Sequence, residues 1–207
     1  MSGRRHLPAG ARARVITVSD RAYRGIYADR SGPLLVAGLV ELGFEVGAAT
    51  IVPDGRDEIV AALRSAVADG VDLVVSTGGT GLGPRDVTPE ATREVIERAV
   101  PGLAEALRAA GRETVPAAML SRGLVGTVAA TLVVNLPGST GGVRDGLGVL
   151  AGVVGHAVAQ LRGADDHGHP AAGSAGPAAA VDAAAVDAAA VDAAAVDAAV
   201  VDAVDAG

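Results

Sequence analysis

A glycine-rich segment near the middle of the chain is the strongest candidate for chemistry. It runs from Thr77 to Pro89, reads TGGTGLGPRDVTP, and follows the strand-like run VDLVVS at 71–76. Glycines let a ligand approach the backbone, whose free N–H groups can bind an anion. Thr80 adds a hydroxyl group and Arg85 a guanidinium. This composition predicts a phosphate-binding loop; the alternative is a tight structural turn.

Two aspartates follow consecutive strand-like segments. Asp54 comes after the run 45–52, and Asp86 lies within the glycine-rich segment. If the two strands are neighbours, we expect both carboxylates to converge on one cleft. Mg²⁺ is typically held by one or two carboxylates together with substrate phosphates, so the pair predicts a magnesium site. The alternative for Asp54 is a turn or cap residue, because Gly55 follows it.

A third loop, NLPGST at 135–140, also lies between a strand and a helix. It offers backbone donors and the hydroxyl groups of Ser139 and Thr140. Asn135 is the only asparagine in the chain. Its amide could contact a ligand directly or satisfy the loop backbone, and the sequence leaves both possibilities open.

Strand-like and helix-like segments alternate along the chain. Strands are expected at 14–19, 45–52, 71–76, 125–128 and 131–135, and helices at 31–42, 56–69, 89–100, 102–110, 116–122 and 142–161. Continuous Val, Ile and Leu strands separated by helices are typical of a parallel sheet buried on both faces. We therefore predict an α/β fold of three layers, with a mostly parallel central sheet and helices on both faces. Ligands of such sheets bind at the carboxyl ends of the strands, where all three loops lie.

The expected helix 89–100 carries two further predictions. Its amino end would face the glycine-rich segment and favour a phosphate there. Arg93 with Glu97 and Glu94 with Arg98 have the four-residue spacing of exposed ion pairs on a helix.

Charge and composition together divide the chain into three parts. The net charge of −7 over 207 residues belongs to the end of the chain, because residues 164–207 hold eight aspartates and no basic residue. We predict a flexible segment at 1–13, one domain at 14–163 and a low-complexity tail at 164–207. The tail repeats Ala-Val-Asp-Ala-Ala units, whose five-residue period gives a helix no continuous apolar face. A solvated tail and an acidic partner-binding arm are the alternatives.

Missing residue types exclude several classes of chemistry. The chain has no lysine, which excludes a P-loop and Schiff-base catalysis, and no cysteine, which excludes thiol catalysis and disulfides. Its apolar runs are too short for a membrane span, and we expect no signal peptide and a cytoplasmic location. The nearly neutral domain has three aromatic residues, so nucleic-acid binding is not expected.

These motifs together resemble a known family. The chain combines ITVSDRAYRG, a PD pair after the second strand, TGGTGLGPRDVTPEA, AMLSRG and VVNLPGS in that order. This combination resembles the molybdopterin adenylyltransferases, the MogA/MoaB group of molybdenum-cofactor biosynthesis, over roughly residues 14–163. Related loops occur in molybdopterin molybdotransferase and in competence-damage-type nucleotide hydrolases.

The resemblance implies roles for individual residues. The family's two functional aspartates correspond to Asp54 and Asp86, which would be catalytic and would bind Mg²⁺. The residues expected to bind substrate or nucleotide are Asp20, Thr77, Gly78, Gly79, Thr80, Gly81, Arg85, Ser121, Asn135, Pro137, Gly138 and Ser139.

The resemblance also implies an activity. The enzyme would transfer AMP from ATP to the terminal phosphate of molybdopterin and release pyrophosphate. The attacking phosphate is already ionised near neutral pH, so alignment and charge neutralisation are sufficient for catalysis. A homotrimer is implied, and a molybdenum-insertion enzyme of the same pathway is a possible partner. The alternative function is a catalytically silent molybdopterin carrier or scaffold.

Overall fold

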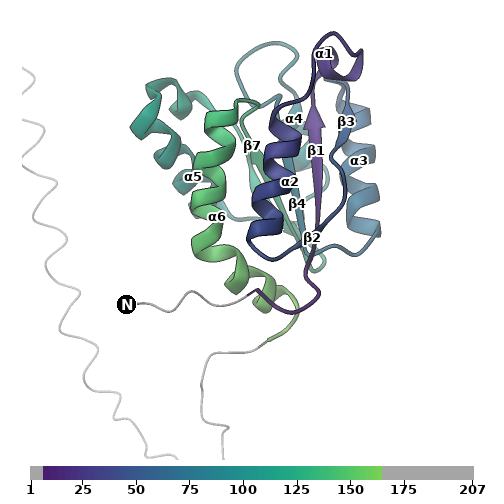
Figure 1. The fold of residues 1–207 in the computed structure, drawn as a ribbon, viewed down its shortest axis with the longest axis vertical. Coiled ribbons are helices and arrows are strands. Elements are labelled where there is room, and N and C mark those ends of the chain that lie inside the picture. Colours follow the sequence, from purple (N-terminus) through teal and green to yellow (C-terminus); the bar gives the residue numbers. More distant parts are fainter. Residues whose placement is uncertain (1–6, 165–207) are drawn as a thin grey trace, which may run out of the picture. The chain divides into compact units, whose positions relative to one another are not determined.

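A computed structural model describes residues 7–164 of the chain (Figure 1). Its strands are β1 (Arg12–Val18), β2 (Glu45–Val46), β3 (Thr50–Val52), β4 (Leu73–Thr77), β5 (Arg98–Ala99), β6 (Val125–Val128) and β7 (Thr131–Leu136). Its helices are α1 (Asp20–Tyr23), α2 (Ser31–Glu41), α3 (Arg56–Ala68), α4 (Thr88–Arg93), α5 (Pro101–Thr114), the short 3₁₀ helix η1 (Pro116–Leu120) and α6 (Thr140–Leu161). The predictions for residues 1–6 and for the tail from 165 onward lie outside the described residues.

The seven strands form one mixed sheet in the order β2-β1-β4-β7-β6-β5, with β3 also paired to β1. All pairs from β2 to β7 are parallel, whereas β6 and β5 are added antiparallel. The loops after β1, β4 and β7 therefore leave the same edge of the sheet side by side. This arrangement confirms the predicted three-layer, mostly parallel fold.

Both faces of the central strands are buried, because neighbouring residues of one strand pack into opposite cores. In β4, Val75 belongs to the core under α2, α5 and α6, while Val74 belongs to the core under α3 and α4. Figure 1 shows α2 and α6 in front of the sheet. Within residues 7–164, no helix combines the length and the apolarity that crossing a membrane would require.

The segment predicted as the helix 89–100 differs from the prediction. Helix α4 ends at Arg93, and the chain then turns and pairs with β6 as β5. The N–H groups of Glu97 and Val100 donate to carbonyls of β6, each at 2.8 Å. This long-range pairing replaces the local helix, so the predicted Arg93–Glu97 and Glu94–Arg98 ion pairs do not form; Glu94 instead pairs with Arg56.

Three other segments also depart from the sequence prediction. The strand expected at 45–52 is divided into β2 and β3, which pair with different parts of β1. The connection between the strand predicted at 14–19 and the helix predicted at 31–42 begins with one turn of helix, α1, capped by the hydroxyl group of Ser19. Strand β1 begins at Arg12, two residues before the predicted start.

Candidate functional site

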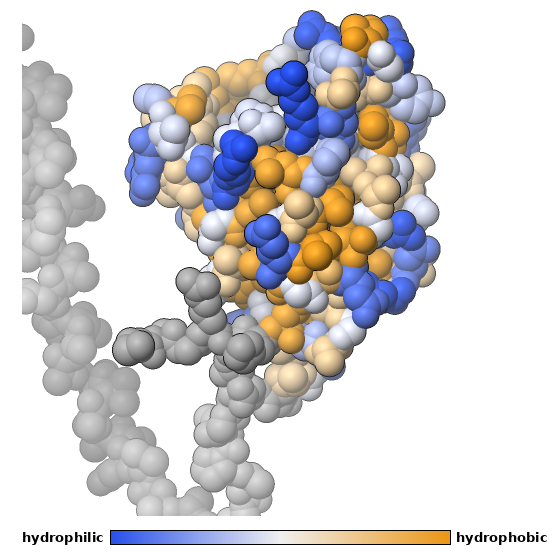
Figure 2. All heavy atoms as spheres, viewed as in Figure 1, coloured by the Kyte–Doolittle hydropathy of each residue, from blue (hydrophilic) through white to orange (hydrophobic). Residues whose placement is uncertain are grey.

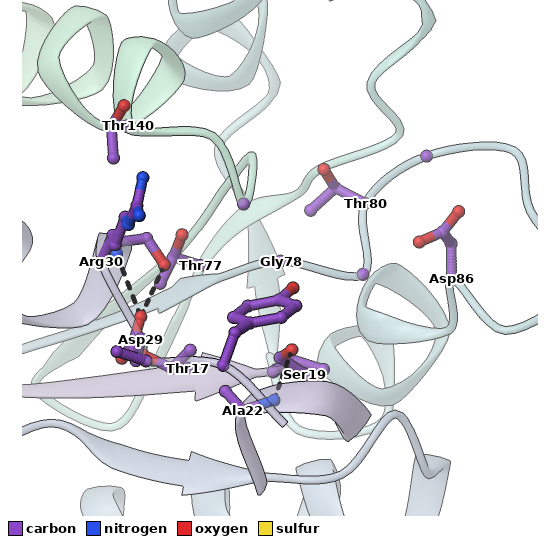
Figure 3. A pocket seen from close by; sticks show the side chains of 17 residues that line it. Thr17, Ser19, Ala22, Asp29, Arg30, Thr77, Gly78, Thr80, Asp86 and Thr140 are labelled. Atoms are coloured by element: carbon purple, nitrogen blue, oxygen red, sulfur yellow. Dashed lines mark hydrogen bonds between the residues drawn. The ribbon is translucent and has the colours of Figure 1, made fainter. Parts of the chain in front are cut away.

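A polar cleft of about 620 Å³ opens at the carboxyl ends of β1 and β4 (Figure 3). Its walls come from the end of β1 and α1, the segment before α2, the glycine loop at 77–81 with Asp86, and the start of α6. The cleft therefore lies at the predicted edge of the sheet. The predicted site residues that line it are Thr77, Gly78, Gly79, Thr80, Gly81, Asp86 and Gly138.

The glycine loop adopts a backbone that favours glycine. Gly78 and Gly79 have φ angles of +106° and +62°. A Cβ at Gly78 would lie 2.3 Å from the carbonyl oxygen of Val18, and one at Gly138 would lie 3.3 Å from Cα of Gly78. The ends of β1, β4 and β7 thus approach one another through bare backbone, and Gly78, Gly79 and Gly138 line the cleft without side chains.

The threonines around the glycine loop are buried. The hydroxyl group of Thr77 donates to the carbonyl of Pro137, and that of Thr88 donates to the carbonyl of Gly78, both at 2.9 Å. These bonds hold the loop against α4 and the β7–α6 connection. The hydroxyl group of Thr80 forms no hydrogen bond with another residue of the described chain, so it is the threonine available to a ligand.

Arg122 holds the far half of the loop and was not among the predicted site residues. Its backbone N donates to the carbonyl of Thr80 at 2.9 Å, and its Nε donates to that of Gly81 at 2.8 Å. Its remaining nitrogens contact the carbonyl of Asp86 and the carboxylate of Glu90. The hydrogen bond from Arg122 lowers the pKa of Glu90. Arg122 therefore fixes the backbone on both sides of the loop.

Three predicted residues form a chain of contacts beside the cleft. The carboxylate of Asp20 accepts a hydrogen bond from the backbone N of Asp54 and pairs with Arg85 at 2.6 Å. Asp86, next to Arg85, lines the cleft and accepts a hydrogen bond from the N of Gly83 at 2.8 Å. Asp54 is not part of the cleft wall; its link to Asp86 runs through Asp20 and Arg85.

Asp29 is a cleft residue that the list of predicted site residues missed. Its Oδ2 accepts a hydrogen bond from the hydroxyl group of Thr17 at 2.7 Å, and its Oδ1 accepts from the N of Ser31 and of Gly32, each at 3.0 Å. It thereby ties the start of α2 to the end of β1 and places Arg30 in the cleft wall (Figure 3). An Asp two residues before the helix predicted at 31–42 was the available signal.

A second, mostly apolar pocket of about 380 Å³ shares Thr80 and Gly81 with the polar cleft. It lies between α5, η1, the end of β7 and the start of α6. Its apolar lining includes Ala104, Leu107, Val115, Ala117, Ala118, Leu120 and Leu136. The predicted residues that line it are Ser121, Asn135, Pro137 and Ser139.

Asn135 uses its whole amide within the protein. Its Nδ2 donates to the hydroxyl groups of Ser76 and Thr92, both at 2.9 Å, and its Oδ1 accepts from the N of Leu124 at 3.0 Å. The side chain is buried. Of the two alternatives for Asn135, the structure favours a structural role, because its amide is bonded to the backbone of Leu124 and to two hydroxyl groups of the protein.

The residues of the cleft fit a divalent cation that arrives with phosphate groups. No three Asp, Glu or His side chains within residues 7–164 lie together as a preformed metal site. The Oδ1 atom of Asp86 takes part in no hydrogen bond within that range, and Asp86 lines the cleft. One carboxylate of this kind, completed by phosphate oxygens and water, is a normal Mg²⁺ environment.

Comparison with known proteins agrees with this geometry. The family model described as "Probable molybdopterin binding domain" matches residues 14–156. A solved structure of MogA is 48% identical, with a TM-score of 0.70, and the match covers 72% of this chain and 98% of that one. The Mog protein of Mycobacterium ulcerans is 47% identical, also with a TM-score of 0.70, over 73% and 99% of the two chains.

Curated relatives belong to the same group. A molybdenum cofactor biosynthesis bifunctional protein of Synechococcus elongatus is 45% identical over 160 residues, which are 77% of this chain and 50% of that protein. The chain thus spans about half the length of the bifunctional relatives it matches. The molybdopterin adenylyltransferase of Pyrococcus furiosus is 37% identical over 72% of this chain and 89% of its own length. The chain belongs to the family of probable molybdopterin binding domains, with the fold of MogA and MoaB.

Proposed function

We propose that this protein is a molybdopterin adenylyltransferase, which transfers AMP from ATP to the terminal phosphate of molybdopterin and releases pyrophosphate. The main support for the proposal is that Thr80 and Gly81 line both pockets. A substrate in one pocket and a substrate in the other would therefore meet at these two residues. The relatives named molybdopterin adenylyltransferase support the same reaction.

Each pocket suits one substrate. The polar cleft offers the glycine loop, Arg30 and the amino end of the long helix α6, all of which favour a triphosphate. The amino end of α6 takes the role predicted for the helix at 89–100, because α4 has only six residues. The apolar pocket accommodates the pterin ring, with the molybdopterin phosphate directed toward Thr80.

The chemistry requires positioning more than a strong base. An oxygen of the molybdopterin phosphate forms a new bond to the α-phosphorus of ATP, and the bond from that phosphorus to pyrophosphate breaks. The attacking oxygen is already ionised, so no protein group has to remove a proton. The backbone of the glycine loop and the hydroxyl group of Thr80 hold the phosphates in line, while Arg30 balances their charge.

Mg²⁺ belongs to this proposal as the ion of the Mg–ATP substrate. Asp86 would hold it through Oδ1, and Asp54 is proposed as the second carboxylate. When bound, Mg²⁺ neutralises charge on the phosphate oxygens. Asp20 and Arg85 hold the backbone that carries both carboxylates.

A pyrophosphate-release assay with molybdopterin, ATP and Mg²⁺ tests the proposal and separates it from the carrier hypothesis. We expect release that depends on both substrates and on the metal. Molybdopterin binding without pyrophosphate release would support a carrier or scaffold and would contradict the enzyme.

We further propose that the protein assembles as a homotrimer and works with a molybdenum-insertion enzyme of the same pathway in the cytoplasm. Figure 2 shows apolar atoms gathered over α2 and α6, the helices that carry the exposed Val40 and Val153. The bifunctional relatives support a partner of this pathway. Sedimentation equilibrium should give three times the chain mass, and a monomer mass would contradict the trimer.

A further inference from the structure

Aromatic side chains are scarce in this chain, and their distribution is uneven. The only aromatic residues are Tyr23, Tyr27 and Phe44. Phe44 is buried in the core, whereas Tyr23 and Tyr27 are 60% and 52% exposed. Of the three, Tyr27 alone lines the polar cleft. The cleft thus has one aromatic ring, beside hydroxyl groups, carboxylates, glycine backbone and small apolar side chains such as Ala22 and Ala28.

The backbone on both sides of Tyr27 is held in place. On one side, the N of Ile26 donates to the carbonyl of Arg21 in α1 at 2.9 Å. On the other side, Asp29 is bound to Thr17 of β1 and to the first residues of α2. Tyr27 therefore projects from a short connection between two fixed points. A ring that is half exposed on such a connection is available to a flat ligand.

We propose that Tyr27 stacks on the nucleobase of the bound nucleotide and so sets where ATP lies over the glycine loop. The inference rests on the proposed function, which puts a triphosphate in this cleft. With the phosphates at residues 77–81, the base needs an apolar partner elsewhere in the same cleft, and the ring of Tyr27 provides it. Stacking on an aromatic ring is tolerant of base identity. Tyr27 thus contributes affinity for the nucleotide without selecting adenine over guanine.

The pterin ring of molybdopterin is the other flat heteroaromatic group that could stack here. The apolar pocket beyond Thr80 and Gly81 favours the nucleobase for Tyr27, since that pocket already provides a place for the pterin. The two possible stacking partners can be distinguished by experiment. A change at Tyr27 alters the binding of ATP if the ring stacks on the nucleobase, and the binding of molybdopterin if it stacks on the pterin.

Tyrosine fluorescence gives a direct test, because the chain has no tryptophan and two tyrosines. In Tyr23→Phe, the emission comes from Tyr27 alone. We expect Mg–ATP and Mg–GTP to quench it, while inorganic tripolyphosphate, which lacks a base, leaves it unchanged. In the converse variant, Tyr27→Phe, the emission comes from Tyr23 alone. Any decrease in that emission on adding nucleotide measures light absorbed by the nucleotide and is subtracted. Quenching by molybdopterin but not by ATP would overturn the assignment.

Steady-state kinetics provides the second readout. Tyr27→Ala should raise KM for ATP about tenfold or more and leave KM for molybdopterin unchanged, since base stacking on an aromatic ring contributes on that order. Tyr27→Phe should behave like the wild type, and Tyr23→Ala is the matched control outside the cleft. An unchanged KM for ATP in Tyr27→Ala would overturn the inference even if adenylyl transfer is intact. Quenching by ATP without any transfer would instead overturn the proposed function and leave the role of Tyr27 standing.

Discussion

Asp20 and Asp54 exchange hydrogen bonds across 34 residues of sequence. The backbone N of Asp20 donates to Oδ2 of Asp54 at 2.9 Å, and the backbone N of Asp54 donates to Oδ1 of Asp20 at 3.1 Å. The other oxygen of Asp20 pairs with Arg85. Asp20 therefore joins the loop after β3 to the segment that carries Asp86, and a change at Asp20 affects the position of both proposed metal-binding carboxylates.

Two substitutions at Asp20 separate its two contacts. Asp20→Ala removes both the acceptor for Asp54 and the partner of Arg85, so we expect kcat/KM for adenylyl transfer to fall about 100-fold. Asp20→Asn keeps an acceptor for the N of Asp54 but loses the charge that Arg85 requires, and we expect a loss of about tenfold. Pyrophosphate release measures both. Equal losses would show that the bond to Asp54 contributes nothing of its own.

Asp86→Asn tests the proposed metal-binding carboxylate. The amide keeps the size of the side chain but binds Mg²⁺ poorly, so adenylyl transfer should fall by about 100-fold or more while molybdopterin binding changes by less than about twofold. Asp57→Asn is the matched control, since Asp57 is exposed in the first turn of α3. Turnover at the wild-type rate in Asp86→Asn would remove this residue from the mechanism.

Gly78→Ala tests the backbone of the glycine loop. The positive φ and the nearby carbonyl oxygen of Val18 leave no room for a Cβ, so we expect a loss of stability of about 1–3 kcal/mol and loss of transfer. Gly148→Ala is the control: it lies within α6, and outside the nearby backbone of that helix no atom lies within 4 Å of the added Cβ, so it should stabilise the helix by about 0.5–1 kcal/mol. Thermal unfolding of the two variants compares them. If Gly78→Ala were as stable as the wild type, the idea that a Cβ at this position strains the backbone would be wrong.

Stability should depend on pH through Asp72 and Arg162. Two hydrogen bonds join their side chains, at 2.6 and 2.8 Å, and the N of Arg12 donates to the same carboxylate at 2.8 Å. Burial raises the pKa of Asp72, but the hydrogen bonds from Arg162 and Arg12 outweigh it and bring the pKa below the ordinary 3.8. Because the folded pKa is the lower one, the contribution is present above pH 3.8 and disappears as the pH falls through the folded pKa.

We therefore expect Asp72→Asn to lower the free energy of unfolding by about 2 kcal/mol at pH 7 and by progressively less below about pH 4. Asp69→Asn, which removes the exposed pair with Arg14, is the control and should change stability by less than about 1 kcal/mol. Denaturant unfolding at several pH values measures both. A difference between wild type and Asp72→Asn that does not change with pH would contradict the ionic origin of the contribution.

Local pattern was sufficient for most of the fold. The apolar runs that became β4 and β7 and the amphipathic stretch that became α3 are each visible in the sequence, because strands buried on both faces are continuous in Val and Leu. The segment 94–100 could not be predicted in this way. Its conformation depends on pairing with β6, which lies about 30 residues further along the chain, and no local preference encodes such a pairing.

Spacing located the loops of the candidate site but not the directions of their side chains. Thr80 and Asp86 belong to one glycine-rich segment, so their place beside a common cleft follows from local pattern. The condition set for Asp54 and Asp86 is not met, because β1 lies between β3 and β4. The roles of Arg122 and Asp29 depend on contacts formed only in the folded chain, between loops far apart in sequence. The role of Asn135 could not be predicted for the same reason, because its three hydrogen-bond partners come from β4, α4 and the segment before β6.

The change of strand direction at β7 makes the apolar pocket possible. A further parallel strand beside β7 would send another loop and helix over this edge of the sheet. The antiparallel β6 instead enters here, with Val125 opposite Val134, so its preceding segment 121–124 arrives from outside and leaves space beneath α5 and η1. That space is lined by α5, η1, the end of β7 and the start of α6, whereas the glycine loop is held by the ends of the parallel strands and by Arg122. A change in the segment before β6 would therefore reach both pockets, because Arg122 joins that segment to the carbonyls of Thr80 and Gly81.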